Sequence, residues 1–182
     1  QTTPIQLCLM TAQIANGGYK IQPKILTDDN ELTSEQVKKA MQDSKINDSY
    51  EPLYDDQKNI RIVQEAMFSS TNEIMGTSYK SRIDDPKYQF AGKTGTAQVK
   101  RISKRERELD LKTFQIPYEE RDHALYVAYG PYSNPRYAVS IIVEHGGSGS
   151  LTAAPMATQL FKLIIDRHQY RKKLPDYKEF SI

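Results

Sequence analysis

The chain has 182 residues, 38% of them hydrophobic and 26% charged, which is enough for one rather polar domain with a core of its own. Its 25 basic and 23 acidic residues nearly balance, so the composition gives no case for nucleic-acid binding. No apolar run is long enough to cross a bilayer and no charged-then-apolar segment opens the chain, so we expect neither a transmembrane helix nor a signal peptide within these residues.

The amino-terminal residues have the pattern of a capped helix. Thr3 can cap the helix, and Gln6 completes a capping box. Gly17 and Gly18 are expected to end it in left-handed geometry. Cys8 lies inside this helix as the single cysteine of the chain, so it excludes an internal disulfide and is expected to be a small core residue.

A polar stretch separates this helix from the next one. Residues 19–26 predict a short extended segment, and residues 27–58 are so poor in large aliphatic side chains that we expect a surface insertion. Residues 59–74 then predict a second helix that Gly76 closes. The apolar positions at helical spacing are Ile60, Val63, Met67 and Ile74.

Residues 100–121 form a highly charged segment that we expect to be a solvated loop between two strands. The alternative is a phosphate or lipid-headgroup contact through its basic residues. Acidic residues interrupt that basic cluster, which favours the loop.

The remaining residues predict a hairpin and a last helix. Apolar runs at 122–129 and 137–143 flank a Gly- and Pro-rich turn and are apolar on both faces, as in the middle of a covered sheet. After a flexible joint at 146–150, a helix is predicted from Pro155 to His168, followed by a weakly ordered tail at 171–182. The expected apolar face of this last helix consists of Met156, Leu160, Leu163 and Ile164. The element order predicts an α+β fold in which helices cover an antiparallel sheet.

Residues 90–99 form a short strand that contains Gly92-Lys93-Thr94-Gly95-Thr96. A buried strand avoids glycine and lysine, so such a strand is one that a ligand approaches. Lys93 offers a fixed cation, Thr94 a hydroxyl donor, Gly95 a close backbone approach and Thr96 an amide for an oxyanion. A Walker A phosphate loop is excluded because Lys87 stands where that motif needs its first glycine.

Several stretches together resemble the penicillin-binding proteins, and most closely the class B enzymes of the penicillin-binding protein 2 type. Lys93-Thr94-Gly95 matches the family's third motif. The other matching stretches are residues 2–8 with 15–18, 76–79, 91–98, 122–124, 129–135 and 144–149. The resemblance covers most of residues 1–170, except the insertion and the charged loop.

The resemblance implies a partial serine β-lactamase/transpeptidase-like fold and a D,D-transpeptidase that cross-links peptidoglycan stem peptides through a serine acyl-enzyme. β-Lactam antibiotics would acylate the same serine. The resemblance also implies a longer parent protein, anchored by an amino-terminal helix at the periplasmic face of the bacterial inner membrane. The implied partners there are elongation-complex membrane proteins. It implies no cofactor and no metal. Lys93 and Thr96 take the catalytic roles, and Lys93, Thr94, Gly95 and Thr96 bind the substrate.

The sequence departs from the family because it contains no Ser-x-x-Lys nucleophile motif. Three stretches imitate a missing motif in the wrong context, and we interpret them as coincidences: Thr77-Ser78-Tyr79-Lys80, Ser70-Thr71-Asn72 and Tyr132-Ser133-Asn134. Residues 1–182 are therefore expected to be the carboxyl-terminal part of a transpeptidase domain, inactive and prone to self-association when alone. The alternative is a non-catalytic module that binds peptidoglycan or a partner protein.

Overall fold

The computed structural model describes residues 2–21, 23, 52–53, 55–100 and 111–172. Most of the expected insertion at 27–58, residues 101–110 of the charged loop and residues 173–182 of the tail lie outside the described residues. In the described chain, no helix has the length and apolarity that a membrane crossing requires.

The centre of the fold is a three-stranded antiparallel sheet. Its strands are β1 (Ala91–Ala97), β2 (His123–Gly130) and β3 (Tyr137–Val143), in the order β1-β2-β3. The predicted hairpin is confirmed as β2 and β3, which pair from Ala124 with Val143 to Gly130 with Tyr137. Within the described residues β1 pairs only with β2, so it is an edge strand.

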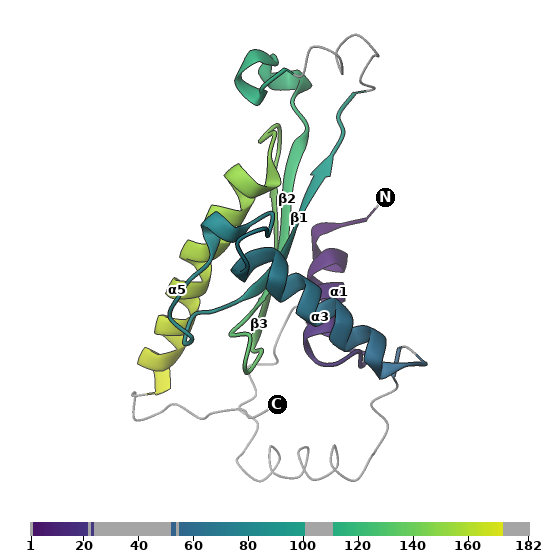
Figure 1. Cartoon of the computed structure of the whole chain (residues 1–182), viewed down its shortest axis with the longest axis vertical. Helices are drawn as coiled ribbons and strands as arrows, with labels where there is room; N and C mark the ends of the chain where they lie inside the picture. Colours follow the sequence, from purple (N-terminus) through teal and green to yellow (C-terminus); the bar gives the residue numbers. More distant parts are fainter. Residues whose placement is uncertain (1, 22, 24–51, 54, 101–110, 173–182) are drawn as a thin grey trace, which may run out of the picture.

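Helices cover both faces of this sheet (Figure 1). They are α1 (Pro4–Ala15) and α3 (Gln57–Asn72) on one side and α5 (Ala154–Lys172) on the other. Side chains of β2 alternate between the two layers, because successive residues of a strand point to opposite faces. Tyr126 packs with Phe161 of α5, whereas Tyr129 packs with Met67 of α3. The α+β prediction is therefore confirmed.

The predicted capping box of the first helix is confirmed. The Gln6 amide donates to Thr3 Oγ1 (3.4 Å) while the Thr3 amide donates to Gln6 Oε1 (2.8 Å), which closes the capping box. Gly17 and Gly18 follow with φ of +93° and +91°, in the region that favours glycine. Asp56 caps α3, because its Oδ1 accepts the Lys58 amide at 2.8 Å.

The predicted carboxyl end of α3 is wrong. The helix ends at Asn72, and the Ile74 side chain is 78% exposed. The chain folds back on the helix, where the Ser78 amide donates to the Ser70 carbonyl at 3.0 Å. Gly76 permits this return, since a Cβ there would lie 2.6 Å from the Ser69 carbonyl oxygen.

The predicted face of the last helix is wrong in part, and its predicted end is wrong. Leu160 packs against the core as expected, but Met156 and Leu163 are 50% and 67% exposed. The buried stripe consists of Ala157, Phe161 and Ile165, and Phe161 stacks on Phe90 with ring centroids 4.9 Å apart. Because alanine contributes little to a hydrophobic pattern, the sequence does not show this buried stripe clearly. The helix runs to Lys172, into the segment expected to be a tail.

Two connections expected to be irregular have regular turns. A π-helical turn, η4 (Gly149–Ala153), leads into α5 where a flexible joint was predicted, and Ser148 Oγ accepts the Leu151 amide at its start (3.4 Å). The described part of the charged loop contains two 3₁₀ turns, η2 (Thr113–Gln115) and η3 (Tyr118–Glu120). These turns lie beyond the helices, at the far end of the β1–β2 ribbon (Figure 1).

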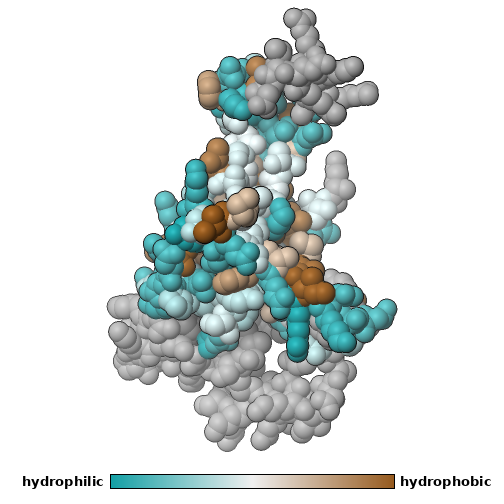
Figure 2. Space-filling model, in the orientation of Figure 1, coloured by the Kyte–Doolittle hydropathy of each residue, from teal (hydrophilic) through white to brown (hydrophobic). Residues whose placement is uncertain are grey.

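Large apolar side chains are exposed on the described surface, and Met75 beside the end of α3 is 93% exposed. Figure 2 shows brown, hydrophobic residues on the surface over α3. Exposed apolar patches of this kind promote association. We expect the chain of 182 residues, studied alone, to show a mass by light scattering that rises with concentration. A constant monomer mass at the highest concentration would contradict this expectation.

Candidate functional site

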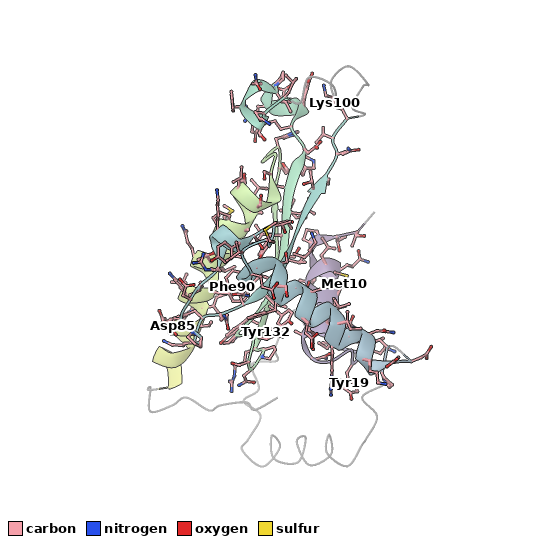
Figure 3. All side chains as sticks on the ribbon, in the orientation of Figure 1. Met10, Tyr19, Asp85, Phe90, Lys100 and Tyr132 are labelled. Carbon is pink, nitrogen blue, oxygen red and sulfur yellow. The ribbon has the colours of Figure 1, made fainter. Side chains whose placement is uncertain are left out.

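The Lys-Thr-Gly segment lies in the middle of edge strand β1. Lys93 and Thr96 are exposed, and Thr94 and Gly95 are half-buried. Phe90 and Lys100, labelled in Figure 3, flank the strand at its two ends. Because an edge strand has a partner on one side only, alternate backbone N–H and C=O groups of β1 are directed away from β2. The strand can therefore offer backbone hydrogen bonds to a ligand.

Lys93 and Thr94 are hydrogen-bonded to each other. Lys93 Nζ donates to the Thr94 carbonyl oxygen at 3.0 Å and approaches Thr94 Oγ1 at 3.4 Å. The ammonium is solvent-exposed and keeps a free donor, since Lys carries three N–H bonds. A cation and a hydroxyl thus stand side by side at the sheet edge.

A groove of about 580 Å³ opens beside Lys93, between α1, α3 and β1. Its apolar lining includes Met10 and Ile14 from α1, Val63 and Met67 from α3, and Val127 from β2. Figure 3 shows Met10 on α1, next to the sheet. Its polar lining consists of Ser69, Ser70, Glu73, Thr77 and Lys93. The groove combines an apolar body with a few polar groups, as ligand sites commonly do.

A line of hydroxyl groups connects Ser70 of α3 to Thr94 of β1. Ser70 Oγ lies 3.1 Å from Thr77 Oγ1, which lies 3.3 Å from Thr94 Oγ1. In the sequence, Ser70 and Thr77 belong only to accidental motif matches, and no local signal links them to Thr94. Asn72, the last residue of one such match, donates instead to the carbonyls of Phe68 and Phe90, at 3.0 and 2.9 Å.

A second, buried hydroxyl cluster lies behind β1. Tyr126 Oη is 2.9 Å from Thr71 Oγ1 and 3.1 Å from Ser78 Oγ, and all three side chains are almost fully buried. Burial raises the pKa of the Tyr126 phenol, so it stays neutral and keeps its proton for donation. The ring of Tyr126 occupies the space where a side chain at Gly92 would be, so Gly92 and Tyr126 fix the distance between β1 and its neighbours.

Two further polar side chains make structural hydrogen bonds. The His145 amide donates to His123 Nδ1 at 3.0 Å. The half-buried Cys8 thiol donates to the Ala138 carbonyl at 3.3 Å, and burial raises its pKa. Among the described residues, no cluster of three or more His, Cys, Asp or Glu side chains could hold a metal ion.

Comparison with protein families matches residues 1–164 to the penicillin-binding protein transpeptidase domain. The chain is 32% identical over 165 residues to the peptidoglycan D,D-transpeptidase MrdA of Salmonella typhimurium, covering 90% of this chain and 25% of the relative. It is 36% identical over 159 residues to MrdA of Acinetobacter baumannii, covering 85% of this chain and 21% of the relative.

Solved structures show the same similarity. Penicillin-binding protein 2 of Helicobacter pylori, in a complex with MreC, superposes with a TM-score of 0.59 at 26% identity and covers 94% of this chain and 25% of that chain. Penicillin-binding protein 2 of Pseudomonas aeruginosa, in complex with WCK 5153, superposes with a TM-score of 0.59 at 30% identity and covers 90% of this chain and 30% of that chain.

The chain thus spans about a quarter of the length of the curated relatives it matches. Its sheet and helices form part of a serine β-lactamase/transpeptidase-like fold. The chain belongs to the penicillin-binding protein transpeptidase family and is of the class B, penicillin-binding protein 2 type.

Proposed function

We propose that residues 1–182 are the carboxyl-terminal portion of the transpeptidase domain of a peptidoglycan D,D-transpeptidase, and that strand β1 binds the substrate carboxylate there. The observation that carries the proposal is the pairing of an exposed ammonium with a hydroxyl, Lys93 with Thr94, on an edge strand beside an apolar groove. The relatives named as peptidoglycan D,D-transpeptidases support the reaction class.

The substrate in this proposal is a stem peptide that ends in a carboxylate. The peptide lies along the open edge of β1, where Gly95 adds no side chain that would hold its backbone away. Thr94 donates its hydroxyl to the terminal carboxylate, and Lys93 supplies the neighbouring positive charge. Hydrogen bonds to charged groups contribute about 1.5–3 kcal/mol each.

The catalytic step needs a serine that these 182 residues do not supply in a Ser-x-x-Lys motif. The serine oxygen attacks the carbonyl of the penultimate residue, the terminal D-alanine leaves with its amine protonated, and a second stem peptide's amine then takes the acyl group from the serine. The amide of Thr96 stabilises the negative oxygen that develops at that carbonyl. Lys93 favours the ionised form of nearby acids throughout, and no metal or cofactor takes part. β-Lactams acylate the same serine.

The same family membership supports the cellular setting that we propose. We place the whole protein at the periplasmic face of the inner membrane, held there by an amino-terminal helix. The MreC complex of the Helicobacter pylori relative supports a partner among the elongation-complex proteins. If the whole protein carries no Ser-x-x-Lys motif, the alternative function is a non-catalytic module that uses the same strand to bind peptidoglycan or a partner.

Replacement of Thr94 by valine in the whole protein tests the carboxylate role. The second-order rate constant for acylation by a penicillin is expected to fall about tenfold to a hundredfold, because one hydrogen bond to a charged group is lost. The methyl ester of the same penicillin lacks the carboxylate charge and should change less than about threefold. An equal loss with acid and ester would contradict the role of Thr94.

A further inference from the structure

We propose that Thr77 is a positioning residue that directs the single proton of the Thr94 hydroxyl toward the ligand. The inference rests on the proposed function of Thr94 and adds to it a residue outside the Lys-Thr-Gly segment. Its basis is the continuous line of oxygens from Ser70 through Thr77 to Thr94, with steps of 3.1 and 3.3 Å.

Counting protons gives this line a direction. Thr94 Oγ1 has one proton to donate and two lone pairs that accept. Lys93 can only donate, so it occupies one lone pair through its 3.4 Å approach. If the Thr77 hydroxyl donates into the second lone pair, the Thr94 proton has no acceptor left within the protein line and is available to an anion. If Thr77 accepted that proton instead, Thr94 would have none for a carboxylate.

A hydrogen bond that Ser70 donates to Thr77 favours donation from Thr77 to Thr94. A hydroxyl that accepts a hydrogen bond becomes a better donor, because hydrogen bonds in a chain polarise one another. When Ser70 donates to Thr77, the proton of Thr77 points to Thr94, and the proton of Thr94 points out of the line. Each hydroxyl of the line donates one proton to the next, and the Thr94 hydroxyl donates its proton to the substrate carboxylate.

The fold holds Thr77 in place from both sides. On one side is Gly76, which fits against the end of α3 only because it lacks a side chain. On the other side is Ser78, which is 1% exposed and whose hydroxyl donates to the Ser70 carbonyl at 3.0 Å. Thr77 itself remains exposed and lines the groove. A residue fixed in this way needs little reorganisation when a ligand arrives, which is how preorganised donors act.

The test uses the whole protein with a penicillin and its methyl ester as probes. Thr77→Val keeps the shape of the side chain and removes the hydroxyl. We expect its acylation rate constant to fall roughly three- to tenfold with the acid, the range for one neutral hydrogen bond, and to stay unchanged with the ester. Thr77→Ser restores the hydroxyl and should recover most of the rate with the acid.

Two further variants complete the design. Ser70→Ala leaves the Gly76–Ser78 turn intact, so it keeps the test valid if Thr77→Val folds poorly, and we expect an acid-specific loss of roughly two- to fivefold. Thr158→Val is the matched control, because the Thr158 hydroxyl on α5 donates to the Ser81 carbonyl and Thr158 neither belongs to the line nor lines the groove. It should leave both rate constants unchanged.

The outcomes separate this inference from the proposed function. Equal losses with acid and ester in Thr77→Val would show a merely structural role and overturn the inference. A normal acid-to-ester ratio in both Thr77→Val and Ser70→Ala, while Thr94→Val loses that ratio, would overturn the inference alone. A normal ratio in Thr94→Val would overturn both.

Discussion

Replacing Lys93 by methionine in the whole protein is expected to lower the second-order rate constant for acylation by a penicillin about a hundredfold. Methionine keeps the length and the apolar stem of the side chain but removes the only charge next to Thr94 that the described structure records there. A hydrogen bond between charged partners contributes about 1.5–3 kcal/mol, and the upper part of that range corresponds to a hundredfold. Stopped-flow fluorescence or quenched labelling measures the rate.

Lys80→Met is the matched control for this experiment. Lys80 is also an exposed lysine, but it lies in the 3₁₀ turn η1 (Tyr79–Ser81) and is not among the residues that line the groove. Its replacement should leave the rate constant unchanged. Lys93→Arg keeps the charge but changes the shape of the charged group. Its rate constant for acylation should therefore lie between those of Lys93→Met and Lys80→Met. A Lys93→Met enzyme within threefold of the original would contradict the role assigned to this strand.

Gly92→Ala is expected to be the most destabilising small substitution on β1, at a cost of about 2–5 kcal/mol. Its Cβ would overlap the hydroxyl end of Tyr126 and lie 2.8 Å from Cε1 of that ring. Overpacking a core costs about 1–3 kcal/mol. Tyr126 can retreat only by breaking its hydrogen bonds to Thr71 and Ser78, and each buried group left unsatisfied costs about 1–3 kcal/mol. Urea unfolding of the transpeptidase domain measures the loss.

Gly95→Ala is the control on the same strand. Its Cβ would meet Leu125 Cβ at 3.3 Å, which needs a shift of only a few tenths of an ångström, so we expect a loss below about 1 kcal/mol. Adding Tyr126→Phe to Gly92→Ala removes the overlapping oxygen, so the double variant should lose less stability than the sum of the two single variants. Strict additivity, or equal losses at Gly92 and Gly95, would show that Tyr126 does not set the position of β1.

Much of the architecture could be predicted because its causes are local. The capping box of Thr3 and Gln6 needs two residues three apart, and the β2–β3 hairpin follows from two apolar runs around one turn. The exposure of Lys93 on an edge strand follows from the cost of burying a charge.

The parts that could not be predicted depend on contacts between distant residues. Thr77 reaches Thr94 only because Gly76 lets the chain fold back along α3, and a helix pattern that continues to Ile74 hides that return. Gly92 owes its role to Tyr126, 34 positions later, which the sheet brings behind β1. The buried face of α5 is only partly visible in the sequence, because the surface it covers accepts small side chains such as Ala157.

In the proposed function, these residues supply the carboxylate-binding strand of a penicillin-reactive site but not its nucleophile. The most direct test exposes the whole protein and the separate chain of 182 residues to the same fluorescent penicillin and compares them on a denaturing gel. We expect a covalently labelled band for the whole protein and none at the mass of the separate chain. A labelled band for the separate chain, or an unlabelled whole protein, would contradict it.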